Sequence, residues 1–134
     1  MVLMVGSTPI IYSAKRQGCI STSTYSAELM AVREATVKLI ELRLLMRSLG
    51  VVVRSASKLY CDNPGVFQSV GEGESATKRH TSIAYHLVRE TVAAGIMKPC
   101  HIEGVHNPAD LFTKSLTSPA FVKHRGQLMY LKGG

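Results

Sequence analysis

Short apolar runs separated by polar turns open the chain. Apolar residues at positions 1–5 and 10–12 predict two strands, and the polar residues 6–9 between them predict the turn of a hairpin. Residues 19–22 are expected to extend a further strand. The first part of the chain therefore favours an antiparallel ribbon.

A helical pattern follows from residue 24 to about residue 49. Ser23 or Thr24 is expected to cap its N-terminus, and Gly50 stands where helices commonly end. One acidic residue, Glu28, falls on the otherwise apolar stripe and is expected to face the sheet. The stripe contains Glu28, Val32, Ala35, Leu39, Leu42, Met46 and Leu49.

The second half of the chain alternates strand and helix patterns. Strands are predicted at 51–53 and 58–61, and Asp62-Asn63-Pro64-Gly65 breaks the second of them. Such alternation predicts one α/β domain over residues 1–134 with a mixed sheet. The remaining expected elements are a short helix over 64–70, a helix over 81–94, a strand over 96–103, a helix from 107 to about 113 and a C-terminal helix from 118 to about 131.

Composition narrows the range of functions. Sixteen Lys and Arg residues against nine Asp and Glu residues give a net charge of +7, which favours a polyanionic partner such as nucleic acid over a membrane surface. A solvated basic surface is the simpler alternative. Cys19, Cys61 and Cys100 form no close pair, which argues against disulfides and zinc and fits an intracellular protein. No apolar run reaches membrane-spanning length.

Three carboxylates stand at positions that chemistry often uses, and each has a simpler explanation. Glu28 on an apolar helix stripe is a candidate metal ligand, or a partly solvated residue in the first turn of its helix that favours the helix dipole. Asp62 after an apolar strand is a candidate catalytic residue, or an ordinary turn residue. Asp110, three residues after Asn107 and next to Pro108, also fits a helix-capping arrangement. The five histidines show no metal-binding spacing.

Five sequence blocks together point to a family. They are Ser21–Glu28, Tyr60–Asn63, Thr77–His80, Tyr85–Glu90 and Asn107–Lys114. In this order and spacing they resemble the ribonuclease H region at the end of copia-type retrotransposon polyproteins. The family pattern is a serine-rich segment followed by Ala-Glu, then Tyr-Cys-Asp-Asn, Lys-His, Tyr-His-x-x-Arg-Glu and Ala-Asp-x-x-Thr-Lys. The resemblance covers nearly the whole chain.

The resemblance implies a ribonuclease H-like fold, a mixed sheet flanked by helices, and cleavage of RNA in RNA–DNA hybrids. It implies that Glu28, Asp62 and Asp110 are catalytic and hold two Mg²⁺ or Mn²⁺ ions, whose preference for hard oxygen ligands suits carboxylates. The reverse transcriptase portion of the same polyprotein is the implied partner, in a cytoplasmic virus-like particle or the nucleus. The expected nucleic-acid contacts are Asn63, Lys78, Arg79, His80 and Arg89. His106 is an accessory candidate, or simply a loop residue.

One departure from the family pattern concerns the first catalytic aspartate. The family carries it on a central first strand, whereas here no Asp or Glu precedes Glu28. We expect a domain incomplete at its N-terminus, with low stability or self-association through unpaired strands. Met1 is either an internal methionine of a longer frame or the start of a decayed copy. A catalytically dead remnant that only binds nucleic acid is the alternative to an active enzyme.

Overall fold

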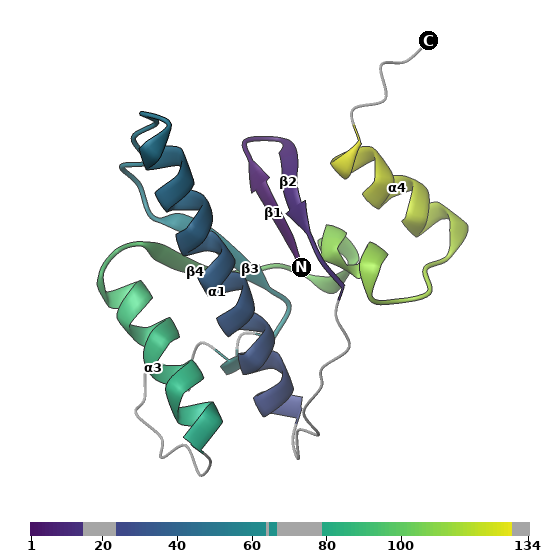
Figure 1. Cartoon of the computed structure of the whole chain (residues 1–134). Coiled ribbons are helices and arrows are strands. Elements are labelled where there is room, and N and C mark those ends of the chain that lie inside the picture. Colours follow the sequence, from purple (N-terminus) through teal and green to yellow (C-terminus); the bar gives the residue numbers. More distant parts are fainter. Residues whose placement is uncertain (15–23, 64, 67–78, 130–134) are drawn as a thin grey trace. The chain divides into compact units, whose positions relative to one another are not determined.

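The computed structural model describes residues 1–14, 24–63, 65–66 and 79–129 (Figure 1). The chain divides into two compact units, and each is described by itself. One unit comprises Met1–Arg16 with Ile102–Gly134, and the other comprises Gln17–His101. In the described residues three α-helices accompany two small two-stranded sheets. The mixed α/β composition is therefore confirmed, while the ribonuclease H-like arrangement stays a prediction.

A hairpin forms the N-terminal part of the first unit. Strands β1 (Val2–Val5) and β2 (Thr8–Tyr12) are antiparallel. Gly6 has a φ of 61°, so the turn needs only residues 6 and 7. The predicted turn over 6–9 was therefore too long. Pro9 lies in β2 opposite Met4, beside a shift in register, and such an irregular strand tolerates the missing amide donor.

The C-terminal part of the first unit is helical. It contains η1 (Gly104–His106) and η2 (Pro108–Phe112), both 3₁₀ helices, and then α4 (Ser118–Leu128). The predicted helix after Asn107 is thus present, with 3₁₀ geometry. The Tyr12 ring stacks on the Phe112 ring at 5.5 Å between centroids, which joins β2 to η2.

The second unit is built around two long helices, α1 (Thr24–Ser48) and α3 (Arg79–Ala93). Both end at a glycine with positive φ, Gly50 at 79° and Gly95 at 68°. After α1, the Gly50 amide donates to the Arg47 carbonyl and the Val51 amide donates to the Met46 carbonyl. This is the Schellman arrangement, and α3 ends with the same pair of bonds. The predicted ends of both helices are confirmed.

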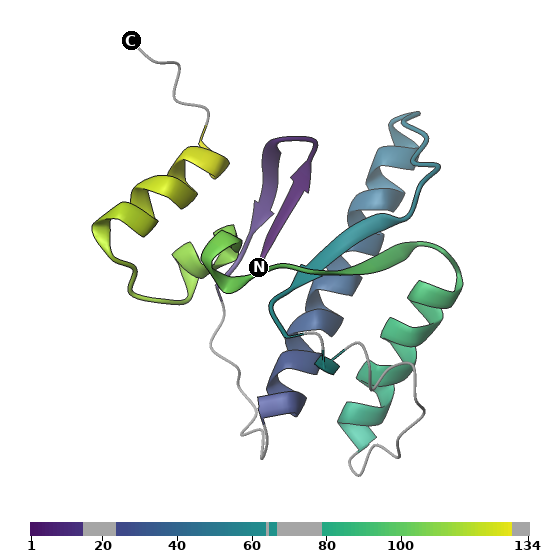
Figure 2. The ribbon, with the colours of Figure 1, turned by 180° about the vertical axis from the view of Figure 1, so that it is seen from behind.

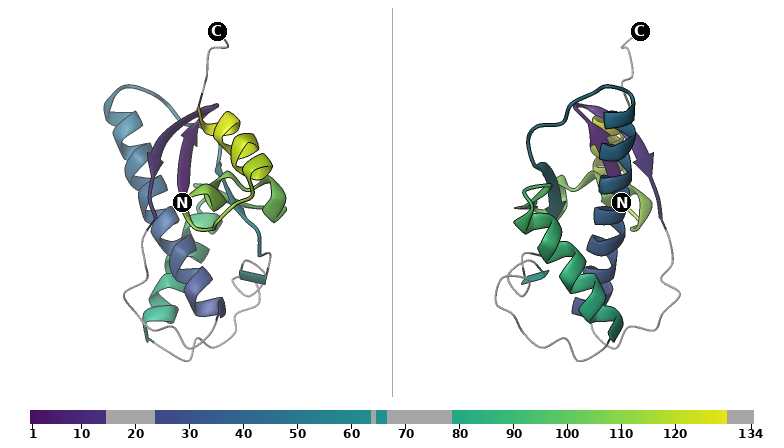
Figure 3. Two further views of the ribbon diagram at one scale, coloured as in Figure 1. Left: turned by 90° about the vertical axis from the view of Figure 1, so that its right-hand side faces the viewer. Right: turned by 60° about the vertical axis from the view of Figure 1, so that its left-hand side comes forward.

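The sheet of the second unit pairs β3 (Ser57–Cys61) with β4 (Met97–His101) in parallel, from Ser57 opposite Met97 to Cys61 opposite His101. Helices α1 and α3 lie side by side on one face of these strands (Figures 1 and 2). The two helices can also be followed in Figure 3. Burial of apolar side chains between these layers is the main stabilising contribution. The fully buried side chains there include Leu29, Thr36, Val66, Ala84, Val88 and Met97.

Two details of the second unit differ from the prediction. Val51–Val53 form no strand, because the Val51 amide bonds to the end of α1 and the Val53 carbonyl accepts from the Arg43 guanidinium at 3.1 Å. On α1 the buried face includes Leu29 and Thr36, whereas Leu49 at the end of the expected stripe is 72% exposed. The predicted strand at 19–22 and most of the predicted helix over 64–70 lie outside the described residues.

Candidate carboxylate site

Glu28 and Asn63 come from distant parts of the chain and meet in the second unit. Asn63 follows β3, and its side-chain amide donates to Glu28 Oε2 at 2.5 Å. The Asn63 Oδ1 atom accepts from the Gly65 amide at 2.9 Å, so the same side chain also braces the turn. Glu28 is half-buried in the second turn of α1. Its carboxylate is therefore held against the end of β3, as its place on the helix stripe suggested.

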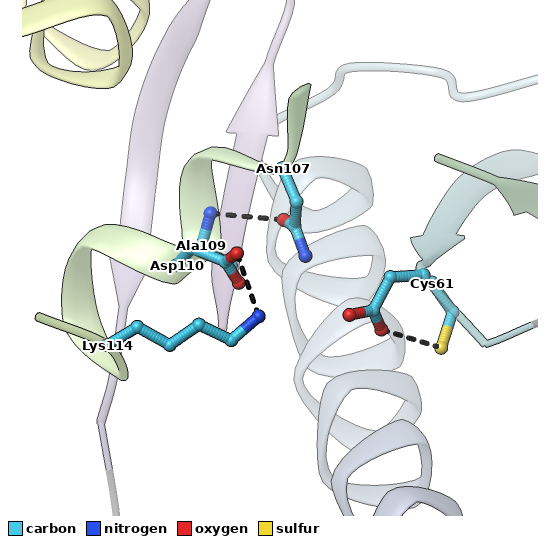
Figure 4. A network of polar contacts seen from close by, with 6 residues as sticks. Cys61, Asn107, Ala109, Asp110 and Lys114 are labelled. Carbon is cyan, nitrogen blue, oxygen red and sulfur yellow. Dashed lines mark hydrogen bonds and ion pairs between the residues drawn. The ribbon is translucent and has the colours of Figure 1, made fainter. Parts of the chain in front are cut away.

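Asp62 follows the last residue of β3 and is exposed, so its predicted place at the end of a strand is confirmed. The Cys61 thiol lies 4.0 Å from Asp62 Oδ1 (Figure 4). Burial raises the pKa of the Cys61 thiol, and the negative charges of Asp62 and Glu28 raise this pKa further. The negative charges of Asp62 and Glu28 therefore both act on the Cys61 thiol. They favour its neutral form, and they would favour a cation bound nearby.

Asp110 belongs to the first unit, where η2 places it. The Asn107 side chain caps this helix by accepting from the Ala109 amide at 3.1 Å, and Pro108 occupies the first turn (Figure 4). The predicted capping arrangement is confirmed. Asp110 is only 8% exposed, and its Oδ2 accepts from Lys114 Nζ at 2.9 Å. A buried carboxylate of this kind needs an opposite charge, which Lys114 supplies.

The donor atoms suit a divalent metal in kind. Glu28, Asp62 and Asp110 all offer hard carboxylate oxygens, which Mg²⁺ prefers. Within the described part of each unit, however, no group of three His, Cys, Asp or Glu side chains forms a metal-binding cluster. Among the described residues of the second unit, Glu28 and Asp62 are thus fewer carboxylates than a cluster of three would contain.

The expected nucleic-acid contacts fall into three groups. Arg89 is exposed on α3 and free to reach a phosphate from that helix face. Arg79 and His80 lie in the first turn of α3, but their side chains are outside the described part, as is all of Lys78. Asn63 binds Glu28 and Gly65. Its contacts are those of a residue that positions a carboxylate.

His106 lies exposed in η1. Its Nδ1 is 3.1 Å from Lys123 Nζ, and its Nε2 is 3.8 Å from Glu103 Oε2. His106 thus lies between a lysine and a glutamate of the first unit.

Sequence reasoning missed the partners of these residues. Lys114 follows Asp110 by four positions, and this i,i+4 spacing was a usable signal for an ion pair. The bond from Asn63 to Glu28 spans 35 residues, and no local pattern indicates it. The hydrogen bonds from Arg43 to Val53, Ser55 and Ser57 were likewise not apparent from spacing.

Comparisons with known proteins give the chain a family context. It is 27% identical over 121 residues, 90% of its length, to the "Retrovirus-related Pol polyprotein from transposon RE2" of Arabidopsis thaliana. The same figures hold for the corresponding polyprotein from transposon RE1. It is 31% identical over 106 residues, 78% of its length, to the polyprotein from transposon TNT 1-94 of Nicotiana tabacum. The chain is a distant homologue of copia-type retrotransposon Pol polyproteins.

These Pol homologues are much longer proteins, and the chain spans about 8% of the length of each. No family model matches the chain, and no solved structure matches it. In the described residues no helix is long and apolar enough to cross a membrane. Homology thus assigns the chain to the family of Pol polyproteins.

Proposed function

We propose that the chain is the ribonuclease H region of a copia-type retrotransposon polyprotein and hydrolyses the RNA strand of RNA–DNA hybrids. The observation that carries the proposal is the bond from Asn63 to Glu28, directly beside Asp62 at the carboxyl end of a parallel strand. Catalytic residues of α/β proteins gather at such strand ends. The homology to Pol polyproteins supports the same assignment.

The proposed chemistry needs an activated water and a stabilised leaving oxygen, which two bound Mg²⁺ or Mn²⁺ ions supply. Glu28 and Asp62 would hold metal through their carboxylates, with Asn63 fixing the orientation of Glu28. Asp110, which belongs to the first unit, is also proposed to bind metal. The exposed Arg89, together with Lys78, Arg79 and His80, would bind backbone phosphates and so position the hybrid without reading its sequence.

The homology to Pol polyproteins also bears on the binding partner of the chain and on its location in the cell. We propose that the chain works beside the reverse transcriptase portion of the same polyprotein, inside the cell, where RNA–DNA hybrids arise. This proposal rests on the identity of the homologues as Pol polyproteins and on the basic charge of the chain. Co-purification of the chain with a separately expressed reverse transcriptase region tests it, and independent elution of the two proteins contradicts it.

The deciding experiment is cleavage of a hybrid labelled on its RNA strand, in Mg²⁺, by this chain and by the chain extended with its upstream coding sequence. Asp62→Asn removes a proposed ligand and is expected to abolish cleavage. Glu41→Gln removes a carboxylate that is paired with Lys38 in the same unit, and it is expected to leave cleavage unchanged. An extended chain that folds and binds hybrid without cutting it rules out the enzyme.

A second candidate function is nucleic-acid binding without turnover. The net charge of +7 favours it, because contacts to phosphates need basic side chains alone. It predicts binding to hybrid and duplex that weakens steeply as salt rises, with no product formed in Mg²⁺ or Mn²⁺. Binding that does not respond to salt argues against this function.

A further inference from the structure

Within the second unit, the sheet of β3 and β4 has one face covered by helices and an opposite face, here called the open face. The Arg43 guanidinium on α1 donates to Ser57 Oγ of β3 at 2.8 Å. The Thr36 hydroxyl on α1 donates to Met97 Sδ of β4 at 3.6 Å. Ser57 and Met97 are paired in register, so both point toward the helices. In Figure 2 the two strands lie in front of α1 and α3, with the open face toward the viewer.

The open face is basic. Lys58 and Lys98 follow the inward-pointing pair, and because side chains alternate between the faces of a strand, both point to the open face. They are exposed and paired in register on strands about 4.8 Å apart. Neither strand contains Asp or Glu, and Asp62 lies just beyond the end of β3. Among the described residues, neither lysine forms an ion pair. Two neighbouring free ammonium groups suit a ligand with repeated negative charges.

Tyr60 adds an aromatic ring to the open face. It lies two residues after Lys58 in β3, on the same side of the strand, and it is 53% exposed. Tyr12, which is also exposed, already stacks on Phe112. Within the described part of the chain, the Tyr60 ring has no stacking partner. An exposed ring next to lysines is the combination that binds unpaired bases, because the ring stacks on a base while the lysines contact phosphates.

We infer that the open face of β3 and β4 binds single-stranded nucleic acid, with Lys58 and Lys98 at its phosphates and Tyr60 stacked on a base. The inference goes beyond the proposed function, in which basic residues of α3 position the hybrid, and it does not require cleavage. A duplex would occupy the lysines alone, because its bases are already stacked on one another and leave the ring without a partner. The exposed ring therefore favours a single strand.

Fluorescence tests the stacking directly. The chain contains no Trp, so Tyr60→Trp introduces a single indole that reports on this face. A short oligothymidylate is expected to quench its emission saturably, and an RNA–DNA hybrid at the same nucleotide concentration is expected to quench it far less. Leu44→Trp places the indole at an exposed position of α1 instead, and it serves as the matched control without saturable quenching.

Affinity measurements separate the ring from the charges. Tyr60→Leu is expected to bind oligothymidylate roughly five- to thirtyfold more weakly, because stacking is lost, whereas Tyr60→Phe keeps the ring and the affinity. Replacing both Lys58 and Lys98 by Gln is expected to make the slope of log affinity against log salt shallower by about 1.4, or about 0.7 for each phosphate contact. Lys38→Gln removes a lysine that is paired with Glu41 and is expected to leave the slope unchanged.

Three results overturn the inference: no quenching at residue 60, equal quenching of Tyr60→Trp by hybrid and single strand, or equal quenching of the two Trp variants. An unchanged salt slope of the double lysine variant overturns it as well, and this variant covers the case in which Tyr60→Leu fails to fold. Hybrid cleavage is assayed separately. Cleavage without quenching at residue 60 refutes the single-strand site and leaves the enzyme, whereas quenching without cleavage does the reverse.

Discussion

The side-chain amide of Asn63 donates to Glu28 Oε2 at 2.5 Å and thereby ties the turn after β3 to the beginning of α1. Asn63 also accepts from the Gly65 amide, so its orientation is determined on both sides. Groups that orient a metal-binding carboxylate commonly matter almost as much as the ligand itself. The sequence predicted a nucleic-acid contact at Asn63, whereas its hydrogen bonds in the structure are those of a residue that orients Glu28.

Asn63→Ala is expected to lower the metal affinity or the hybrid cleavage rate by about 10- to 100-fold, because Glu28 loses its orienting partner. The measurement is Mn²⁺ binding together with steady-state cleavage. If Asn63 instead contacts nucleic acid, the affinity for hybrid falls while the metal affinity stays unchanged. Gly65→Ala perturbs the Asn63 side chain more mildly, since the new Cβ of residue 65 would lie 3.1 Å from Asn63 Oδ1.

The raised pKa of the Cys61 thiol predicts slow alkylation at neutral pH, because the thiolate is the reacting form. Asp62→Asn removes one of the negative charges that raise this pKa, so the thiolate fraction and the rate with iodoacetamide should increase roughly two- to fivefold. The rate is followed by mass spectrometry of the Cys61 peptide as pH is raised. Cys100 in the neighbouring strand serves as the internal reference, and an unchanged rate at Cys61 contradicts the prediction.

Arg43 should be a major stabilising residue of the second unit. Its guanidinium donates to the carbonyls of Val53 and Ser55 and to Ser57 Oγ, so it holds the segment between α1 and β3. Arg43→Met is expected to lower the free energy of unfolding by about 1–3 kcal/mol, as for the loss of charge-assisted hydrogen bonds. Urea denaturation measures this. Arg47→Met on the exposed surface of α1 is the control and should change stability by under about 1 kcal/mol.

The chain is expected to self-associate through its strand edges. Each sheet in the described residues has two strands, and in each sheet one strand contains a proline, Pro9 in β2 and Pro99 in β4. Proline lacks an amide donor, so β1 and β3 are the strands better able to pair with another chain. Light scattering should show a mass that rises with concentration. A monomer at all concentrations with a sharp, high melting transition speaks against this prediction.

Much of the local structure follows from the sequence because its causes are local. Both α1 and α3 end where a glycine permits positive φ, and Asn107 and Pro108 begin η2 through short-range hydrogen bonds. Strand β1 is a short apolar run, and β3 and β4 lie where strands were predicted over 58–61 and 96–103. Local reasoning failed at Val51–Val53, where the apolar residues form no strand. The Val51 amide donates to the Met46 carbonyl at the end of α1, and the Val53 carbonyl accepts from Arg43, ten residues earlier in the chain.

The same division between local and tertiary causes applies to the candidate site. The sequence alone determined which carboxylates are candidate site residues, since Glu28 interrupts an apolar stripe and Asp62 follows a strand. Only the tertiary structure decided that the Asn63 amide donates to Glu28 and that Glu28, in addition to burial, raises the pKa of the Cys61 thiol. Both relations join residues more than 30 positions apart, and they depend on how α1 packs against β3. Side-chain periodicity reports the face of an element, whereas the partner on that face is set by packing.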